Sequence, residues 1–348
     1  MTVLSVAYPL APVRDDTAGG AEQVLAMLDR ALTNAGHHSV VVAAEGSRVA
    51  GTLVATPRAD GTLDKQAEWK AQAAHRNAIE RALQRWPVDL IHFHGQDFAA
   101  YQPARSVPAV VTLHVPRAWY GAELPEQRPE AHFVCVSEAQ RQTWPQDFRI
   151  SAVIENGVDA NAMGTRVSKR RFALWLGRVS PEKGTAIALD AAQMAGTALL
   201  VAGEVYAYEA HKRYFQAEVL PRLNSGAGRF IGPAGFARKR RLLTAARCLV
   251  ITSQAEETSS LVAMEALACG TPVVTFPAGA LRSIVEHGRT GFVASTVEQM
   301  AEGIRCADEI DPAVCRAEAR ERFPAARMAA RYVELYAAVA RRAVRWTA

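Results

Sequence analysis

Short apolar runs alternate with helical patterns along the whole chain, and they form two successive series. The first series of apolar runs is residues 3–7, 39–44, 90–93, 109–113, 132–136 and 152–154, and the second is 172–176, 198–202, 229–231, 248–252 and 272–276. Such alternation is typical of parallel sheets that are covered by helices. The sequence therefore predicts an α/β protein with two doubly wound, Rossmann-like domains and a cleft between them.

Helical patterns and polar stretches indicate where these domains begin and end. The first helical pattern, residues 21–35, places four apolar side chains on one face: Val24, Leu25, Leu28 and Leu32. A polar stretch at 156–171 separates the two series, so we expect the domain boundary there. A last helical pattern at 324–346 is additional to the helices that a second doubly wound domain requires.

The composition is that of an ordinary globular protein, with 49% hydrophobic residues, 22% charged residues and a net charge of +5. The apolar start of the chain is broken by Pro9 and follows no basic residue, which favours a first strand over a signal peptide. No apolar stretch approaches the about 20 residues that cross a bilayer. The five cysteines have no close Cys-x-x-Cys spacing, so we expect reduced, buried thiols in a cytoplasmic protein.

Two glutamates in the second series, Glu257 and Glu265, are the first candidates for a binding site. Three residues between them, Thr258, Ser259 and Ser260, are favourable at a helix N-cap. We therefore expect a helix to begin just after them and to carry Glu265 about two turns along.

This helix is expected to end near Ala268, because Gly270 and Pro272 follow. Its N-terminus offers unpaired amides and a positive dipole end, which suit a phosphate. Glu265 can accept hydrogen bonds from hydroxyls further along the same ligand. The pattern fits a sugar nucleotide as the ligand, although for a pair of glutamates alone two solvated side chains on an amphipathic helix are the favoured interpretation.

Arg178 and Lys183 lie in the first expected strand-to-helix connection of the second domain. Such a connection opens at the carboxyl edge of a parallel sheet, where ligands bind. A guanidinium and an ammonium could together neutralise a diphosphate as it becomes the leaving group. A pair of exposed surface cations is the alternative.

The first domain offers a glycine, a glutamate and three histidines. Gly20 could let the backbone approach a phosphate or form a flexible turn, and Glu22 could contact an acceptor or cap its helix. His92 and His94 close a strand with no third ligand apparent nearby, which favours a structural or sugar-facing role over a metal site. His114 ends another strand and is either a cleft residue or a hydrogen-bonded core histidine.

Several motifs are absent. The first strand of neither half is followed by Gly-x-Gly-x-x-Gly, which disfavours a dinucleotide cofactor, and the chain has no Gly-Lys-[Ser/Thr] phosphate loop. It has no Gly-x-Ser-x-Gly elbow and no His-Glu-x-x-His. It also has no Asp-x-Asp to hold a divalent ion against a diphosphate, so we expect no metal and no other cofactor besides the co-substrate.

Seven segments resemble motifs of the family-4 retaining glycosyltransferases and follow one another in that family's order. The run 256–274 is similar to the family's Glu-x7-Glu signature, and Gly177-Arg178 with Glu182-Lys183-Gly184 is similar to its phosphate motif. The remaining segments are Gly19-Gly20-Ala21-Glu22, Asp89–His94, Val111-Thr112-Leu113-His114, Val134–Glu138 and Asn156-Gly157-Val158-Asp159. The resemblance covers nearly the whole chain.

This resemblance implies a GT-B fold, in which two Rossmann-like domains with parallel sheets face a central cleft. Residues 1–158, with a returning C-terminal helix at 325–348, would form the acceptor-side domain, and residues 159–324 would bind the nucleotide sugar. The implied reaction is front-face transfer with retention of the anomeric configuration, in which the departing diphosphate takes the acceptor's proton.

The resemblance also implies roles for individual residues. The catalytic residues would be Arg178, Lys183, Glu257 and His114. The nucleotide and phosphates of the donor would contact Gly20, Arg178, Lys183, Ser260, Leu261 and Glu265. The donor sugar would contact His114, Glu257, Thr258 and Ser259, and the acceptor would contact Glu22.

Two departures from the family pattern bear on the donor sugar. Thr258-Ser259-Ser260 replaces the usual Gly-Phe-Gly, and Ser283 stands where the family often has a glutamate. We favour a UDP-sugar over a GDP- or ADP-sugar as donor, and a carbohydrate, glycolipid or small hydroxyl compound as acceptor. A sugar-nucleotide epimerase or hydrolase, or a non-catalytic sugar-binding protein, is the alternative.

Three basic clusters could meet acidic lipid or nucleic acid: Lys169-Arg170-Arg171, Arg238-Lys239-Arg240-Arg241, and Arg341, Arg342 and Arg345. No nucleic-acid motif accompanies them, so we expect solvated helix faces and no nucleic-acid partner. A weak peripheral contact at the inner face of a membrane is left open.

Overall fold

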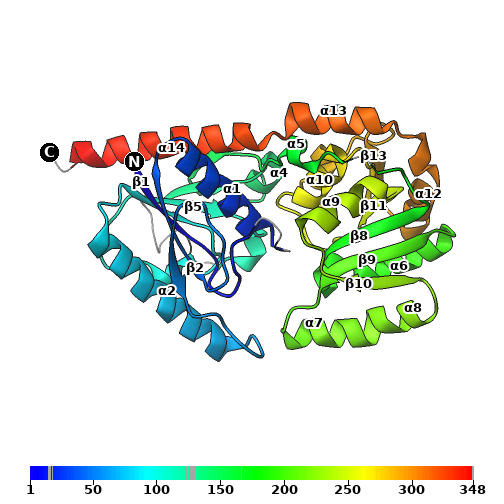
Figure 1. Ribbon diagram of the computed structural model, residues 1–348, viewed down its shortest axis with the longest axis horizontal. Coiled ribbons are helices and arrows are strands. Elements are labelled where there is room, and N and C mark those ends of the chain that lie inside the picture. Colours follow the sequence, from blue (N-terminus) through cyan, green and yellow to red (C-terminus); the bar gives the residue numbers. More distant parts are fainter. Residues whose placement is uncertain (15–16, 18, 122–123, 125–130, 166, 347–348) are drawn as a thin grey trace. The chain divides into compact units, whose positions relative to one another are not determined.

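The computed structural model describes residues 1–14, 17, 19–121, 124, 131–165 and 167–346, with side chains up to Arg341. It divides into two compact units, Met1–Asn156 with Ala325–Ala348, and Gly157–Pro324. Each unit contains one parallel sheet with helices packed against it, which confirms the predicted α/β class (Figure 1). No helix in the described part of the chain combines the length and apolar character needed to cross a membrane.

The first unit has a seven-stranded sheet in the order β3-β2-β1-β4-β5-β6-β7. The strands are β1 (Thr2–Val6), β2 (His38–Ala44), β3 (Thr52–Thr56), β4 (Leu90–Phe93), β5 (Ala109–Leu113), β6 (His132–Cys135) and β7 (Ile150–Val153). The sequence did not indicate β3, since this edge strand is short and only partly buried. Because all neighbours pair in parallel, the carboxyl ends of the strands share one edge of the sheet.

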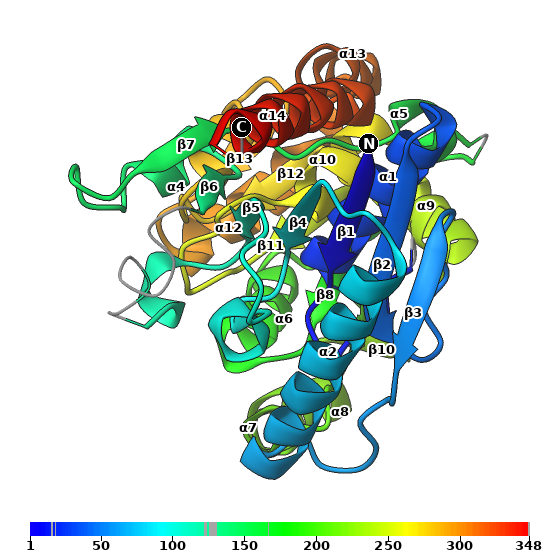
Figure 2. The ribbon, with the colours of Figure 1, turned by 90° about the vertical axis from the view of Figure 1, so that its left-hand side faces the viewer.

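Three long helices cover this first sheet: α1 (Gly20–Asn34), α2 (Lys65–Arg85) and α14 (Ala325–Trp346). Helix α2 packs on one face, where it shares a core with β1, β2 and β4, while α1 packs on the other face together with α14 (Figure 2). Shorter helical segments lie in the loops: η1 (Phe98–Tyr101), η2 (Arg117–Trp119) and α4 (Glu138–Arg141). The C-terminal helix therefore belongs to the first unit.

The second unit has a six-stranded sheet in the order β10-β9-β8-β11-β12-β13. The strands are β8 (Phe172–Arg178), β9 (Ala198–Glu204), β10 (Gly228–Gly232), β11 (Cys248–Ile251), β12 (Val273–Thr275) and β13 (Gly291–Val293). Strand β13 was not indicated by the sequence either, because this edge strand has only three residues. All the strand pairings of this second sheet are parallel, as in the first sheet.

Helices lie on both faces of the second sheet (Figure 1). One group shares a core with the sheet and comprises α6 (Thr185–Met194), α7 (Glu209–Tyr214), η4 (Phe215–Val219), α8 (Leu220–Asn224) and α12 (Val297–Cys306). The other group packs around α10 (Leu261–Ala268) and comprises α5 (Ala160–Met163), α9 (Phe236–Ala245), α11 (Leu281–Ile284) and α13 (Pro312–Arg322). Two 3-10 turns, η3 (Pro181–Lys183) and η5 (Ala307–Glu309), also lie in the described part of this unit.

The five cysteines are all free thiols, and four of them are buried: Cys135, Cys248, Cys269 and Cys315. Burial raises the pKa of the Cys248 thiol to about 12, so this side chain is protonated and acts as a small apolar group.

Candidate functional site

The phosphate-motif loop of the second unit follows β8 and is fixed to the end of β11. The hydroxyl of Thr252 donates to the carbonyl oxygens of Lys183, at 3.0 Å, and Gly184, at 2.8 Å. Gly184 has a φ of +64°, and a β-carbon there would lie 2.4 Å from the carbonyl oxygen of Thr252. Only glycine fits this close approach in a left-handed conformation, and it sets the position of Lys183.

Lys183 and Glu257 form an ion pair in which Nζ lies 2.6 Å from Oε1. The hydroxyl of Ser253 donates to the same carboxylate oxygen. The amide of Ala280 donates to the carbonyl oxygen of Glu257 at 2.8 Å, which holds the backbone in place. Three segments, after β8, β11 and β12, therefore position the Glu257 carboxylate at the carboxyl edge of the sheet.

Arg178 lies at the end of β8 and is only partly paired. One guanidinium nitrogen lies 3.1 Å from Glu182 Oε1, and the guanidinium carbon lies 5.6 Å from the centre of the Tyr206 ring. Its Nε is buried and has no hydrogen-bond partner in the described part of the chain. A buried, unpaired cationic N–H is costly, so this group is suited to an anionic ligand.

Helix α10 begins where the sequence places it, and its first turn is open to a ligand. Ser260 is the N-cap residue, yet its side chain forms no capping hydrogen bond. The hydroxyl of Ser259 is buried and lacks a partner among the described residues. The first amides of the helix, beginning with Leu261, have no intrahelical acceptor, so this end of α10 can bind negative charge.

Glu265 lies inside α10, and its carboxylate is paired with a lysine that sequence analysis missed. Nζ of Lys239, on α9, lies 2.5 Å from Glu265 Oε1, and both side chains are buried. The expectation that the whole cluster Arg238–Arg241 is a solvated helix face is therefore wrong for Lys239. The burial of Lys239 could have been inferred from the sequence, because a helix over 236–245 places Lys239 on the same side as the apolar Leu243.

The three histidines of the first unit are joined directly. Nδ1 of His94 lies 3.0 Å from Nε2 of His114, and Nε2 of His94 lies 3.1 Å from Nδ1 of His92. His92 also bonds the hydroxyl of Tyr336 on α14 at 2.6 Å, and the hydroxyl of Thr112 at 2.7 Å. His92 and His94 are thus part of a buried network that reaches the C-terminal helix.

Burial keeps these three rings neutral. It lowers the pKa of His114 to about 3 and lowers those of His92 and His94 well below the usual value, with a further lowering by their mutual repulsion if charged. No group of three His, Cys, Asp or Glu residues in the described ranges is arranged to hold a metal ion.

Gly20 is the first residue of α1, and Glu22 lies in its first turn. The Glu22 carboxylate folds back over Gly19, where a β-carbon would lie 1.8 Å from Oε2. Glu22 is itself buried. This placement is typical of a capping residue, and the acceptor role stays a prediction.

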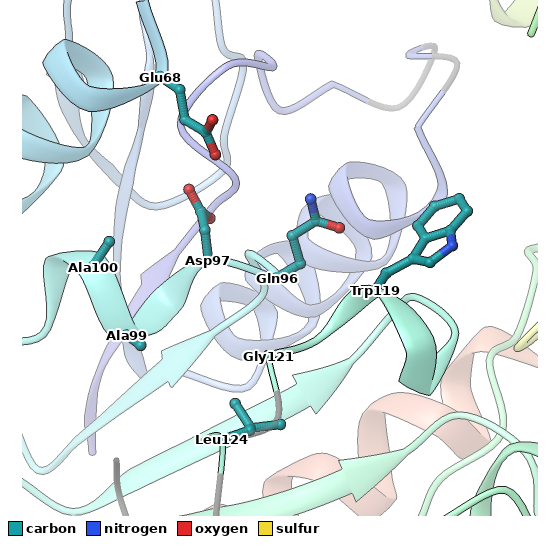
Figure 3. Close-up of a pocket in the computed structure, with 8 residues that line it drawn as sticks. All are labelled: Glu68, Gln96, Asp97, Ala99, Ala100, Trp119, Gly121 and Leu124. Atoms are coloured by element: carbon teal, nitrogen blue, oxygen red, sulfur yellow. The ribbon is translucent and has the colours of Figure 1, made fainter. Parts of the chain in front are cut away.

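A hollow of about 310 Å³ opens at the carboxyl edge of the first sheet, formed by residues that sequence analysis did not select. It is lined by Glu68, Gln96, Asp97, Ala99, Ala100, Trp119, Gly121 and Leu124. Figure 3 shows the carboxylates of Glu68 and Asp97 turned toward one another, with the indole of Trp119 further round the rim. Burial raises the pKa of Asp97, whose carboxylate accepts hydrogen bonds from Gln72 and Tyr101.

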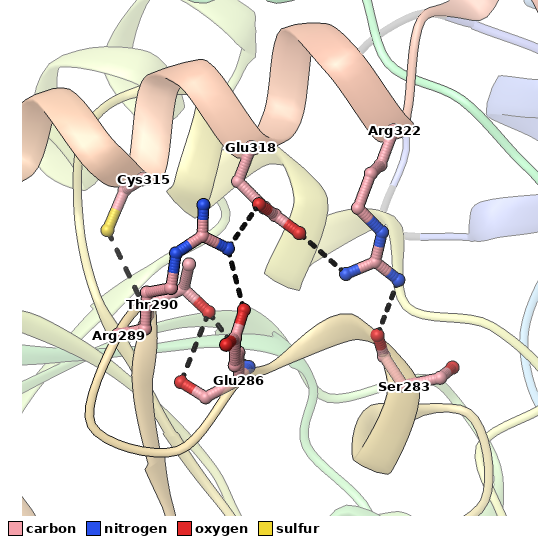
Figure 4. A network of polar contacts seen from close by, with 7 residues as sticks. All are labelled: Ser283, Glu286, Arg289, Thr290, Cys315, Glu318 and Arg322. Atoms are coloured by element: carbon pink, nitrogen blue, oxygen red, sulfur yellow. Dashed lines mark hydrogen bonds and ion pairs between the residues drawn. The ribbon is translucent and has the colours of Figure 1, made fainter.

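A polar network fixes the segment that follows β12 in the second unit. Glu318 of α13 accepts from Arg289 at 2.8 Å and from Arg322 at 2.7 Å, and Arg322 also donates to the carbonyl oxygen of Ser283 (Figure 4). The hydroxyl of Ser283 donates to the carbonyl oxygen of Ala280. Ser283 is therefore held by local bonds.

Two family models match the chain over almost its whole length. The model described as "Glycosyltransferase Family 4" matches residues 18–162, and the model described as "Glycosyl transferases group 1" matches residues 162–322.

Individual proteins of known function are similar to this chain at modest sequence identity. A glycogen synthase of Mycobacterium tuberculosis is 28% identical over an alignment of 270 residues that covers 68% of this chain and 63% of that protein. A D-inositol 3-phosphate glycosyltransferase of Mycobacterium bovis is 34% identical over an alignment of 151 residues that covers 41% of this chain and 30% of that protein. The matched regions thus span less than two thirds of either relative.

Solved structures share the fold. AviGT4, a glycosyltransferase involved in avilamycin A biosynthesis, has a TM-score of 0.71 at 24% identity, covering 97% of this chain and 98% of that one. HepE of Anabaena has a TM-score of 0.75 at 21% identity, covering 97% of this chain and 100% of that one. The sucrose-phosphate synthase of Thermosynechococcus elongatus has a TM-score of 0.77 at 17% identity, with 97% and 98% covered. These similarities show a GT-B fold.

Proposed function

This chain belongs to the family-4 glycosyltransferases of GT-B fold, and on that premise we propose that it transfers a sugar from a nucleoside-diphosphate sugar to a hydroxyl acceptor. The observation that carries the proposal is the ion pair of Lys183 with Glu257, just before the open N-terminus of α10 in the sequence, together with the buried Nε of Arg178 at the end of β8, which has no hydrogen-bond partner among the described residues. Two cations and a set of helix amides at one sheet edge are suited to a diphosphate.

The proposed catalysis is stabilisation of the leaving group. Charge grows on the diphosphate as the bond between sugar and phosphate breaks, and Arg178, Lys183 and the amides near Ser260 and Leu261 are placed to meet it. The acceptor attacks from the same face, its proton passes to the departing diphosphate, and the anomeric configuration is retained. No divalent ion is required, because the two side-chain cations supply the positive charge.

UDP is the proposed nucleotide of the donor. The structure of HepE from Anabaena has been determined with UDP-glucose and with UDP and glucose, which supports this choice over GDP and ADP. Glu265 would accept the ribose hydroxyls, and Glu257, nearer the N-terminus of α10, would contact the sugar.

The acceptor is proposed to occupy the hollow lined by Glu68, Asp97 and Trp119 in the first unit. Carboxylates and amides bond hydroxyl groups, and an indole packs against the apolar face of a sugar ring. Because two carboxylates line the hollow, the proposed acceptor is a neutral or aminated hydroxyl compound such as a carbohydrate.

A thermal-shift panel of UDP, GDP, ADP and their sugars tests the donor. A ligand at 100 times its dissociation constant adds about 2.7 kcal/mol to the free energy of unfolding, which is visible in the melting temperature. UDP and UDP-sugars should give the largest shift, and no shift with any nucleotide would contradict the proposal.

The reaction itself is tested with a responsive donor and added alcohol acceptors, with and without EDTA. We expect a glycoside product, α-linked when the donor is α-linked, and equal rates in EDTA. A free sugar or an epimer would indicate a hydrolase or an epimerase. A β-linked first product, or activity that EDTA abolishes and Mg²⁺ restores, would refute retention or metal independence respectively.

A further inference from the structure

The ion pair between Lys239 and Glu265 is buried on both sides. The lysine side chain is 5% exposed and the glutamate side chain 8%, and no other ion pair in the described ranges has both side chains below a tenth. The pair joins two helices that pack on each other, α9 and α10, and these helices also carry buried apolar side chains such as Leu243 and Leu267.

Such a pair contributes little to the net stability of a fold. Removing two charges from water is costly, and the attraction between them often only offsets this cost. Well-packed apolar side chains would hold α9 against α10 at least as well. The pair is therefore better explained by what it does to the Glu265 carboxylate.

The lysine fixes the direction of that carboxylate. Its Nζ is bound to Oε1 at 2.5 Å from the α9 side, so the carboxylate cannot rotate without losing this bond. The other oxygen, Oε2, is then presented in one orientation. A carboxylate fixed in this way is a suitable acceptor for two neighbouring hydroxyls.

We propose that Lys239 is a positioning residue that aligns Glu265 to bind the ribose 2′- and 3′-hydroxyls, and that it thereby makes the site select ribonucleotides over 2′-deoxyribonucleotides. This inference rests on the proposed function, since it presupposes a nucleoside diphosphate at α10. It adds a residue on a different helix, and a selectivity that depends on it.

Calorimetry with a ribonucleoside diphosphate and its 2′-deoxy form tests the proposal on the full chain. UDP and 2′-deoxy-UDP are the first probes; if GDP or ADP gives the larger thermal shift, that nucleotide and its deoxy form replace them. The wild type should bind the ribonucleotide about tenfold or more tightly. Lys239→Met should weaken ribonucleotide binding about tenfold and change deoxynucleotide binding much less.

The ratio of the two affinities separates alignment from general damage to the fold. A purely structural lysine would, when replaced, weaken both ligands equally and leave the ratio unchanged, and that result would overturn the proposal. Arg241→Met is the matched control, since Arg241 is an exposed residue of the same helix, and it should leave both affinities unchanged.

A second variant covers the case in which Lys239→Met does not fold. Lys239→Arg keeps the charge, but its planar guanidinium places its donors differently, so we expect a folded protein whose ratio falls at least threefold. An unchanged ratio in this variant, or no discrimination by the wild type, would refute the inference while the proposed function stands. Failure of the wild type to bind any ribonucleoside diphosphate would refute both.

Discussion

Nζ of Lys183 lies 2.6 Å from Oε1 of Glu257, so the cation of the phosphate-motif loop and the first glutamate of the Glu-x7-Glu run form one unit. The two residues are separated by 74 positions in the chain. Parallel pairing of β8 with β11 places the ends of their strands at the same edge and brings the residues together.

Lys183→Ala should depress turnover more than donor affinity. The lysine is proposed to meet charge that grows as the leaving group departs, and loss of one such donor costs about 10²–10³ in rate. Steady-state kinetics measures this, with Lys212→Ala, an exposed lysine of the same unit, as the control. A variant that raises only the Michaelis constant would remove the leaving-group role from Lys183.

Glu257→Gln should change the preference among donor sugars and leave the affinity for the free nucleoside diphosphate nearly unaltered. The amide keeps the size of the side chain but loses the charge that pairs with Lys183. Ratios of kcat/KM for a panel of UDP-hexoses measure the preference, and Glu256→Gln, at the exposed neighbouring position, is the control. The same preference in Glu257→Gln and wild type would mean that Glu257 does not contact the sugar.

Trp119→Ala should raise the Michaelis constant of the acceptor about fivefold, because a stacking contact contributes about 1 kcal/mol. The Michaelis constant of the donor should stay the same. Trp69→Ala is the matched control, since Trp69 is 69% exposed and does not line the hollow. Equal acceptor constants in both variants and the wild type would place the acceptor elsewhere.

Acid should destabilise the fold through His75, which burial holds neutral. Burial lowers its pKa from 6.5 to about 4. The unfolded chain therefore binds the proton first as the pH falls. The stability that this neutral ring contributes is complete above pH 6.5 and declines below it, by about 2 kcal/mol at pH 5.

Urea unfolding of the wild type and of His75→Gln at pH 7, 6 and 5 measures the contribution of the neutral His75 ring to the free energy of unfolding. The difference in free energy of unfolding between the two proteins should shift in favour of the variant as the pH falls. A difference that does not depend on pH would show that His75 gains no proton on unfolding in this range.

The sequence was sufficient for most of the fold because both sheets are parallel and their central strands are continuous apolar runs. The interior strand β5, Ala109–Leu113, has the expected bounds, whereas the edge strands β3 and β13 were missed. An edge strand is buried less and pairs on one side only, so its pattern differs little from that of a loop.

The candidate site was predictable where chemistry is concentrated in a short run, as at Glu257 and Glu265. The pairing of Lys239 with Glu265 could not be predicted, because the neighbours Arg238, Arg240 and Arg241 gave the whole stretch the composition of a solvated surface. The hollow near Asp97 was missed for another reason. Its lining comes from α2, from the loop after β4 and from the region of η2, segments that only the tertiary fold brings together.

The place of α14 in the first unit has a consequence for how the chain matures. His92 and Thr112 bond the hydroxyls of Tyr336 and Tyr332, which lie 244 and 220 positions later in the chain. A nascent chain that lacks this helix has two polar groups of its central strands without their partners. The first unit must therefore wait until α14 has been synthesised to complete its core, while Gly157–Pro324, one uninterrupted segment, can finish folding earlier.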